Sequence, residues 1–202
     1  MSAALIFVLG ALTPPYRPAV STDRLGPEQG EQVAAYLARA QDSLTGDTVE
    51  HRWALVSFTA PLVPEQIPAY SDGMRIAQVL YHVALDRVQT PLVTVPVPTP
   101  TSAAVNSARY AAWLLPPPTD ERSARIAAFA AAQLRTGCAC VVGLVVRGAP
   151  AELRSLASHN GIRAVQALPA DAVAGSFAVV PLLPGYRDIV APGPDDGPVP
   201  PP

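Results

Sequence analysis

The sequence predicts an α+β fold, and two observations support that prediction. Residues 51–85 and residues 138–168 each have the pattern of a strand, a short helix and a second strand. Residues 101–136, between these two units, have the apolar spacing of helices. Two such units in one chain are typical of a split βαβ sandwich, whose helices cover one face of an antiparallel sheet. We therefore expect residues 51–190 to form a ferredoxin-like sandwich with a helical insertion.

An apolar run and a proline-rich linker make up residues 1–20. Residues 3–12 carry no charge, but the run is shorter than the roughly 20 residues of a membrane-spanning helix. It also lacks the positive charge that precedes the apolar stretch of a secretory signal. Either the run is a buried element of the domain, or it is the outer half of a truncated membrane anchor on a stiff stalk. The second interpretation predicts a transmembrane protein, associated with the membrane through its N-terminus.

One helix is expected within residues 21–50. Gly26 and Pro27 begin it, because proline suits the first position of a helix, and Gly46 ends it. The helix has one apolar stripe at helical spacing, which predicts core packing: Val33, Tyr36, Leu37, Ala40 and Leu44.

The first strand–helix–strand unit begins with an alternating strand at residues 52–60. One face of this strand carries Ala54, Val56, Phe58 and Ala60, and the other carries Trp53, Leu55 and Ser57. A short helix is expected at Pro64–Ile67, because Pro68 interrupts helical hydrogen bonding. Met74–Leu85 then forms the second strand, and Val93–Pro100 is extended.

The insertion and the second unit follow. Helices are expected at Ser102–Leu115 and Asp120–Arg135, with a rigid corner of three prolines between them. The second unit consists of a strand at Cys138–Val146, a helix that begins near Pro150, and a strand at Ile162–Ala167.

The most apolar strands and the C-terminal tail give two further expectations. Trp53–Phe58 and Cys140–Val146 should lie side by side, because the first and third strands of this sandwich are central and therefore most apolar. Residues 191–202 cannot bury apolar surface and are predicted to be a disordered, proline-rich tail. That tail is either inert or a proline motif that a partner binds.

Composition excludes several functions. All 14 basic residues are arginine, so a Walker-type phosphate loop and a Schiff-base lysine are both impossible. The net charge is −2 and the arginines are scattered singly, whereas nucleic-acid binding needs clustered positive charge. We therefore predict no nucleic-acid partner. The richness in alanine, proline, valine and arginine is typical of a bacterium with a GC-rich genome.

No residue set has the spacing of a catalytic, cofactor-binding or metal site, so we predict no enzyme activity and no cofactor. Cys138 and Cys140 would lie about 7 Å apart on one face of a strand, which predicts buried thiols and leaves a disulfide or redox role as the alternative. His51, His82 and His159 share no metal-ligand spacing.

Residues 149–169, APAELRSLASHNGIRAVQALP, contain a helix that ends in glycine, a short strand and a proline. This segment resembles the closing helix and strand of the subtilisin-propeptide type of ferredoxin-like domain. The resemblance implies the fold and carries no functional residue.

These observations predict a membrane-tethered, extracytoplasmic interaction or scaffold domain of the cell membrane, with a protein partner. Two alternatives remain. One is a soluble, cytoplasmic regulatory domain that binds a small molecule. The other is an inhibitor of the protease-propeptide type.

Overall fold

The computed structural model describes residues 23–46 and 49–201. Its order of elements is β1 (Arg24–Leu25), α2 (Val33–Asp42), β2 (Arg52–Leu62), the 3₁₀ helix η1 (Pro64–Tyr70), β3 (Arg75–His82), β4 (Leu92–Pro96), α3 (Thr101–Val105), α4 (Ala108–Ala111), α5 (Glu121–Arg135), β5 (Val141–Gly148), α6 (Pro150–Ala157), β6 (Ile162–Ala167) and β7 (Ala178–Val179). The α+β class is confirmed.

A five-stranded antiparallel sheet forms the centre of the molecule, in the order β4-β3-β5-β2-β6. Strands β2 and β5 are neighbours, with Ala54 opposite Val146 and Val56 opposite Leu144. The predicted pairing of the two most apolar strands is therefore confirmed. The sheet leaves β4 at one edge and β6 at the other.

Both faces of the sheet are covered, but by different kinds of structure. The helices η1, α3, α4, α5 and α6 share one large core cluster with the sheet face that carries Ala54 and Val56. The other face carries Leu55 and Val145, which pack with Leu25, Leu168 and the half-buried Phe177. The two-stranded parallel sheet of β1 and β7, together with irregular chain, covers this second face.

Small residues allow that irregular chain to lie close to the sheet. A Cβ atom at Gly143 would lie 2.7 Å from the carbonyl oxygen of Val56 and 3.4 Å from the Cβ of Pro181. Beside it, the fully buried Ser57 accepts the backbone N–H of Leu182 on its hydroxyl oxygen at 3.2 Å. The segment around 181 can therefore cross the sheet directly over these two positions.

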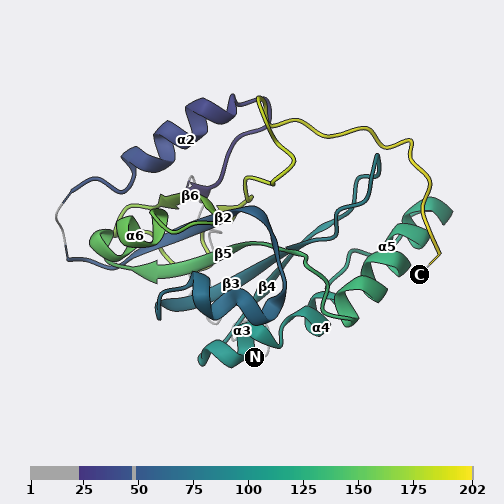
Figure 1. Cartoon of the computed structure of the whole chain (residues 1–202), viewed down its shortest axis with the longest axis horizontal. Helices are drawn as coiled ribbons and strands as arrows, with labels where there is room; N and C mark the ends of the chain where they lie inside the picture. Colours follow the sequence, from purple (N-terminus) through teal and green to yellow (C-terminus); the bar gives the residue numbers. More distant parts are fainter. Residues whose placement is uncertain (1–22, 47–48, 202) are drawn as a thin grey trace, which may run out of the picture.

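The two sheet edges have different neighbours (Figure 1). Helix α2 lies beside β6, and α4 lies beside β4. The chain after β7 returns past α2 and then runs across to α5.

The helix expected within residues 21–50 is shorter than predicted, because it begins at Val33. Gly26 has a φ of 113°, and a Cβ atom there would lie 1.6 Å from the carbonyl oxygen of Val180. The following Gly30 donates its N–H to the carbonyl of Val190 at 2.7 Å. Pairing with residues 180–190 thus overrides the local helix-start signal.

The first helix of the insertion is also different from the prediction of one helix at Ser102–Leu115. It divides into α3 and α4 around Asn106 and Ser107. The Asn106 amide donates to the Ser102 carbonyl, and the Ser107 hydroxyl donates to the Ala104 carbonyl. Such side chains compete with backbone hydrogen bonds and favour a break.

The proline-rich tail differs most from its prediction, because residues 193–197 are held by hydrogen bonds. The Gln89 side chain donates to the Gly193 carbonyl at 2.8 Å, and its backbone N–H donates to Asp195 at 3.0 Å. Arg122 donates to the carbonyl of the buried Gly197 at 3.0 Å. Composition correctly excluded a core here, but polar contacts to a hairpin and to α5 order the segment instead.

No helix within residues 23–46 and 49–201 is long and apolar enough to cross a membrane. The prediction of a transmembrane protein is therefore wrong for the part of the chain that the structure describes. The apolar run and linker at residues 1–20 lie outside that part, so membrane association through them stays a prediction.

Candidate functional site

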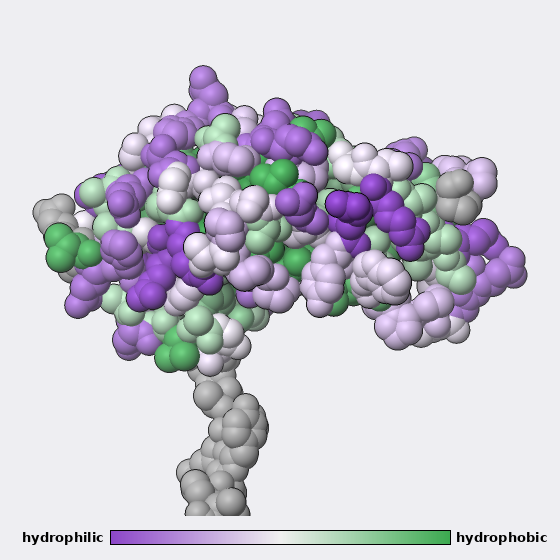
Figure 2. All heavy atoms as spheres, turned by 90° about the horizontal axis from the view of Figure 1, so that it is seen from below, coloured by the Kyte–Doolittle hydropathy of each residue, from purple (hydrophilic) through white to green (hydrophobic). Residues whose placement is uncertain are grey.

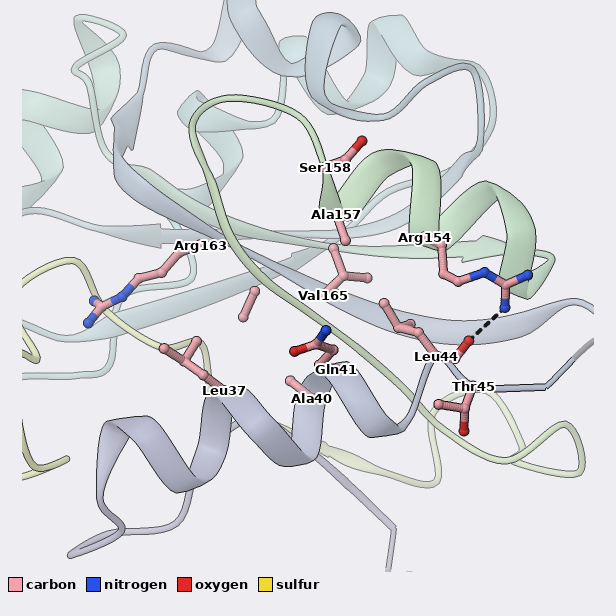
Figure 3. A pocket seen from close by; sticks show the side chains of 11 residues that line it. Leu37, Ala40, Gln41, Leu44, Thr45, Arg154, Ala157, Ser158, Arg163 and Val165 are labelled. Carbon is pink, nitrogen blue, oxygen red and sulfur yellow. Dashed lines mark hydrogen bonds between the residues drawn. The ribbon is translucent and has the colours of Figure 1, made fainter.

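A groove of about 500 Å³ lies between α2 and α6, along the edge of β6 (Figure 3). Its apolar lining comes from all three elements and their ends: Leu37, Ala40, Leu44, Ala157, Ala164 and Val165. Polar side chains stand around this lining: Gln41, Thr45, Arg154, Ser158 and Arg163. The groove therefore combines an apolar interior with a polar, partly positive margin.

Local sequence explains why the groove is hollow. Ala40 on α2 and Ala157 on α6 are small residues at positions where each helix turns toward β6. The buried Val165 of β6 lies between the two helices. Gln41 lies in the middle of the groove in Figure 3 but is exposed to solvent.

The backbone of β6 is open toward this groove. Leu168 donates its N–H to the carbonyl of Trp53 at 2.8 Å, and the preceding Ala167 donates to the hydroxyl of Ser43 on the other side at 2.8 Å. Backbone groups alternate between the two sides of an antiparallel strand. Val165 pairs with Val56 and therefore directs its N–H and C=O, like Ala167, away from β2.

Arginines stand at the two ends of the groove. Arg154 donates to the carbonyls of Leu44 and Gly46. Arg163 donates to the carbonyls of Leu183 and Tyr186. Burial, and then the positive charge of Arg187, lower the pKa of Arg163.

A second hollow, of about 390 Å³, lies at the end of the sheet where β2 and β3 begin. Its side chains carry both signs of charge, and two of them have structural roles. Glu152 accepts the backbone N–H of Ala149 at 2.7 Å, and the guanidinium of Arg147 lies 5.3 Å from the ring centre of Trp53. Within residues 23–46 and 49–201, no group of three or more His, Cys, Asp and Glu side chains is placed to bind a metal.

Cys138 and Cys140 form a disulfide, which corrects the prediction of buried thiols. That prediction placed both residues on a strand, but β5 begins only at Val141. The chain bends before it, so the two Cα atoms lie 5.3 Å apart.

The histidines remain apart from one another. His82 lies with its Nε2 3.1 Å from the hydroxyl oxygen of Thr90, and burial lowers its pKa. His51 lines the charged hollow, and His159 follows α6, where its backbone N–H donates to the Leu156 carbonyl. None of them lines the groove.

Large exposed hydrophobic side chains, two of them aromatic, gather on the insertion. Trp113 is 80% exposed, Tyr110 54% and Leu114 40%. Figure 2 shows the side on which α3 and α4 lie, where small hydrophobic areas alternate with hydrophilic ones. Trp and Tyr are residue types enriched in protein interfaces.

Comparisons with known proteins found no matching family model, no similar curated protein and no similar solved structure. The groove therefore has to be interpreted from its own geometry. Sequence reasoning did not find it, although it did predict β6, the apolar stripe of α2 and the helix that begins near Pro150. The missing information was that α2 packs beside β6, and that packing depends on contacts between residues far apart in the chain.

Proposed function

We propose that this chain is a protein-interaction domain whose α2–α6 groove binds an extended segment of a partner protein by adding it to β6. The observation that carries the proposal is the outward-facing N–H and C=O of Val165 inside an apolar groove. Strand addition is a recurring mode of peptide recognition, in which backbone hydrogen bonds give affinity and flanking pockets give specificity.

The strand order supports a finer description of the fold, which we infer to be ferredoxin-like. Strands β6, β2, β5 and β3 lie in that order, which is the order expected when two strand–helix–strand units interlock. Strand β4 then extends the sheet beyond β3, and α3, α4 and α5 form the insertion before β5.

The shape of the groove favours a peptide over a small metabolite. Small-molecule sites bury most of the ligand surface. Here Gln41 in the middle of the groove and Thr45 and Ser158 at its margin are all exposed, so one side of any occupant stays in solvent. A backbone on the open side of β6 fits that arrangement, because its outward side chains tolerate water.

The proposal can be tested with proline substitutions at the two sheet edges. Fluorescein-labelled, amidated peptides of alternating threonine and valine, with a central Glu, Gln or Lys, serve as probes. Val165→Pro removes the outward N–H and keeps the hydrogen bonds to β2. Thr94→Pro on β4 is the matched control, since proline is tolerated where a strand's N–H faces outward. We expect Val165→Pro to weaken peptide binding by about tenfold or more, from lost and unsatisfied hydrogen bonds, and Thr94→Pro to leave it unchanged.

A steric variant gives an independent reading if Val165→Pro alters the core. Gln41→Trp fills the middle of the groove from an exposed position, and Ala35→Trp places the same side chain on an exposed part of α2 outside the groove. Only the first should reduce the anisotropy change on titration. If none of the three peptides binds the unaltered protein, or if both tryptophan variants bind equally well, strand addition is the wrong function.

A further inference from the structure

The Arg163 end of the groove has unused hydrogen-bonding capacity. Arg163 directs one guanidinium nitrogen at the Leu183 carbonyl, 2.8 Å away, and another at the Tyr186 carbonyl. Both acceptors are neutral backbone groups. A guanidinium carries five N–H donors in a planar fork, so donors remain after these two bonds.

Positive charge at this end is not matched by a carboxylate among the described residues. Arg187 is close enough to act on Arg163 by repulsion. The four ion pairs found within residues 23–46 and 49–201 involve Arg39, Arg87, Arg122 and Arg125. Neither Arg163 nor Arg187 is in that set.

We propose that the partner segment added to β6 carries an acidic side chain, which the guanidinium of Arg163 binds at this end of the groove. The proposal rests on the function proposed above and names the class of its partner. A carboxylate matches the planar fork, and hydrogen bonds between such charged groups are shorter and stronger than neutral ones. Arg163 is itself held in place by two backbone carbonyls, so the site is preorganised.

The position of Arg163 also fixes where the acidic residue must lie. Arg163 is two residues before Val165 on the same strand. When a residue of the added strand pairs with the Val165 backbone, the residue of that strand nearest Arg163 is therefore only one or two positions away along the added strand. The acidic side chain should be internal to the extended segment rather than at a distance from it.

The test compares peptides that differ in charge alone. The central-Glu peptide should bind about tenfold more tightly than the central-Gln peptide, and the central-Lys peptide should bind most weakly. Added salt should reduce the difference between Glu and Gln, because the ion pair is partly exposed. A Gln peptide with a free C-terminal carboxylate tests the other source of negative charge, and it should bind no better than its amidated form.

Variants assign the preference to Arg163. Arg163→Gln should abolish the difference in affinity between the Glu and Gln peptides, and Arg163→Lys should restore part of it. Arg135→Gln, an exposed arginine at the end of α5, is the control and should change nothing. If the peptides bind equally, or if the preference survives Arg163→Gln, the acidic-partner proposal is overturned while strand addition stands. If no peptide binds, strand addition itself fails.

Discussion

The two edges of the sheet are built in opposite ways. On β4, which ends in Pro96, the sequence places Pro91 before the strand and Pro98 after it. Val97 donates its N–H to the Ala77 carbonyl of β3. Because backbone groups alternate along a strand, those of Thr94 and Pro96 face away from β3. Proline has no N–H with which to pair at that edge. Prolines on an edge strand discourage pairing with other chains.

Strand β6 has no proline and is instead flanked by helices. Its outward groups at Val165 face a groove between α2 and α6, and Ser43 already occupies the N–H of Ala167. At the β4 edge, proline therefore prevents pairing with another strand. At the β6 edge, the backbone of Val165 is open to pairing, but helices enclose it on two sides. The difference suggests that unselective pairing is avoided at both edges and that selective pairing is possible at one.

Both edges depend on the central strand, and the largest expected effect lies there. Val145 is fully buried between β2 and β3. We expect Val145→Asp to lower the free energy of unfolding by about 4 kcal/mol or more, because it buries an unpaired charge. Thr94→Asp on the β4 edge should cost less than about 1 kcal/mol. Urea unfolding followed by circular dichroism measures both, and equal losses would mean that β5 is not central to stability.

The disulfide before β5 should have a smaller effect. It closes a loop of only three residues, and chain-entropy arguments give about 1.6 kcal/mol for a loop of that length. Replacing Cys138 and Cys140 together with Ala should therefore lower the unfolding free energy by about 1–3 kcal/mol, with packing loss at the buried Cys140 included. Thermal or urea unfolding of the variant checks this, and dithiothreitol should destabilise only the parent protein. A larger loss than this range would show that the disulfide positions β5 itself.

Replacing Pro96 on β4 tests whether proline keeps this edge from pairing with another chain. Pro96→Thr restores an outward N–H on an exposed edge residue, so we expect some dimer by light scattering at high protein concentration. Pro116→Thr, in the exposed corner of the insertion, should leave the parent's oligomeric state unchanged. If Pro96→Thr also behaves like the parent, proline is not what keeps this edge unpaired.

Sequence reasoning succeeded where local pattern and core burial coincide. The alternation of Ala54, Leu55 and Val56 and the apolar run from Val141 to Val146 predicted two strands and their pairing. It failed where distant segments compete with local signals, as at Gly26, whose backbone packs against Val180 rather than beginning a helix. The groove belongs to this second class, because it exists only where α2 packs beside β6, and these two elements are far apart in the chain.

The smallest expected effect concerns residues 193–197 of the tail, which bond to Gln89 in the hairpin between β3 and β4. The Gln89 backbone N–H and then Arg122 hold the pKa of Asp195 below its ordinary value. A carboxylate with a lowered pKa stabilises the folded state above its ordinary pKa, and the contribution is lost as pH falls through the lowered value. Contact between the tail and Gln89 should therefore persist at neutral pH and weaken only below the ordinary Asp pKa of about 3.9.

The Gln89 amide resonance should titrate in that acidic window, and Asp195→Asn should remove the titration while changing overall stability little. A Gln89 amide that is insensitive both to acid and to Asp195→Asn would show that residues 193–197 do not depend on this carboxylate.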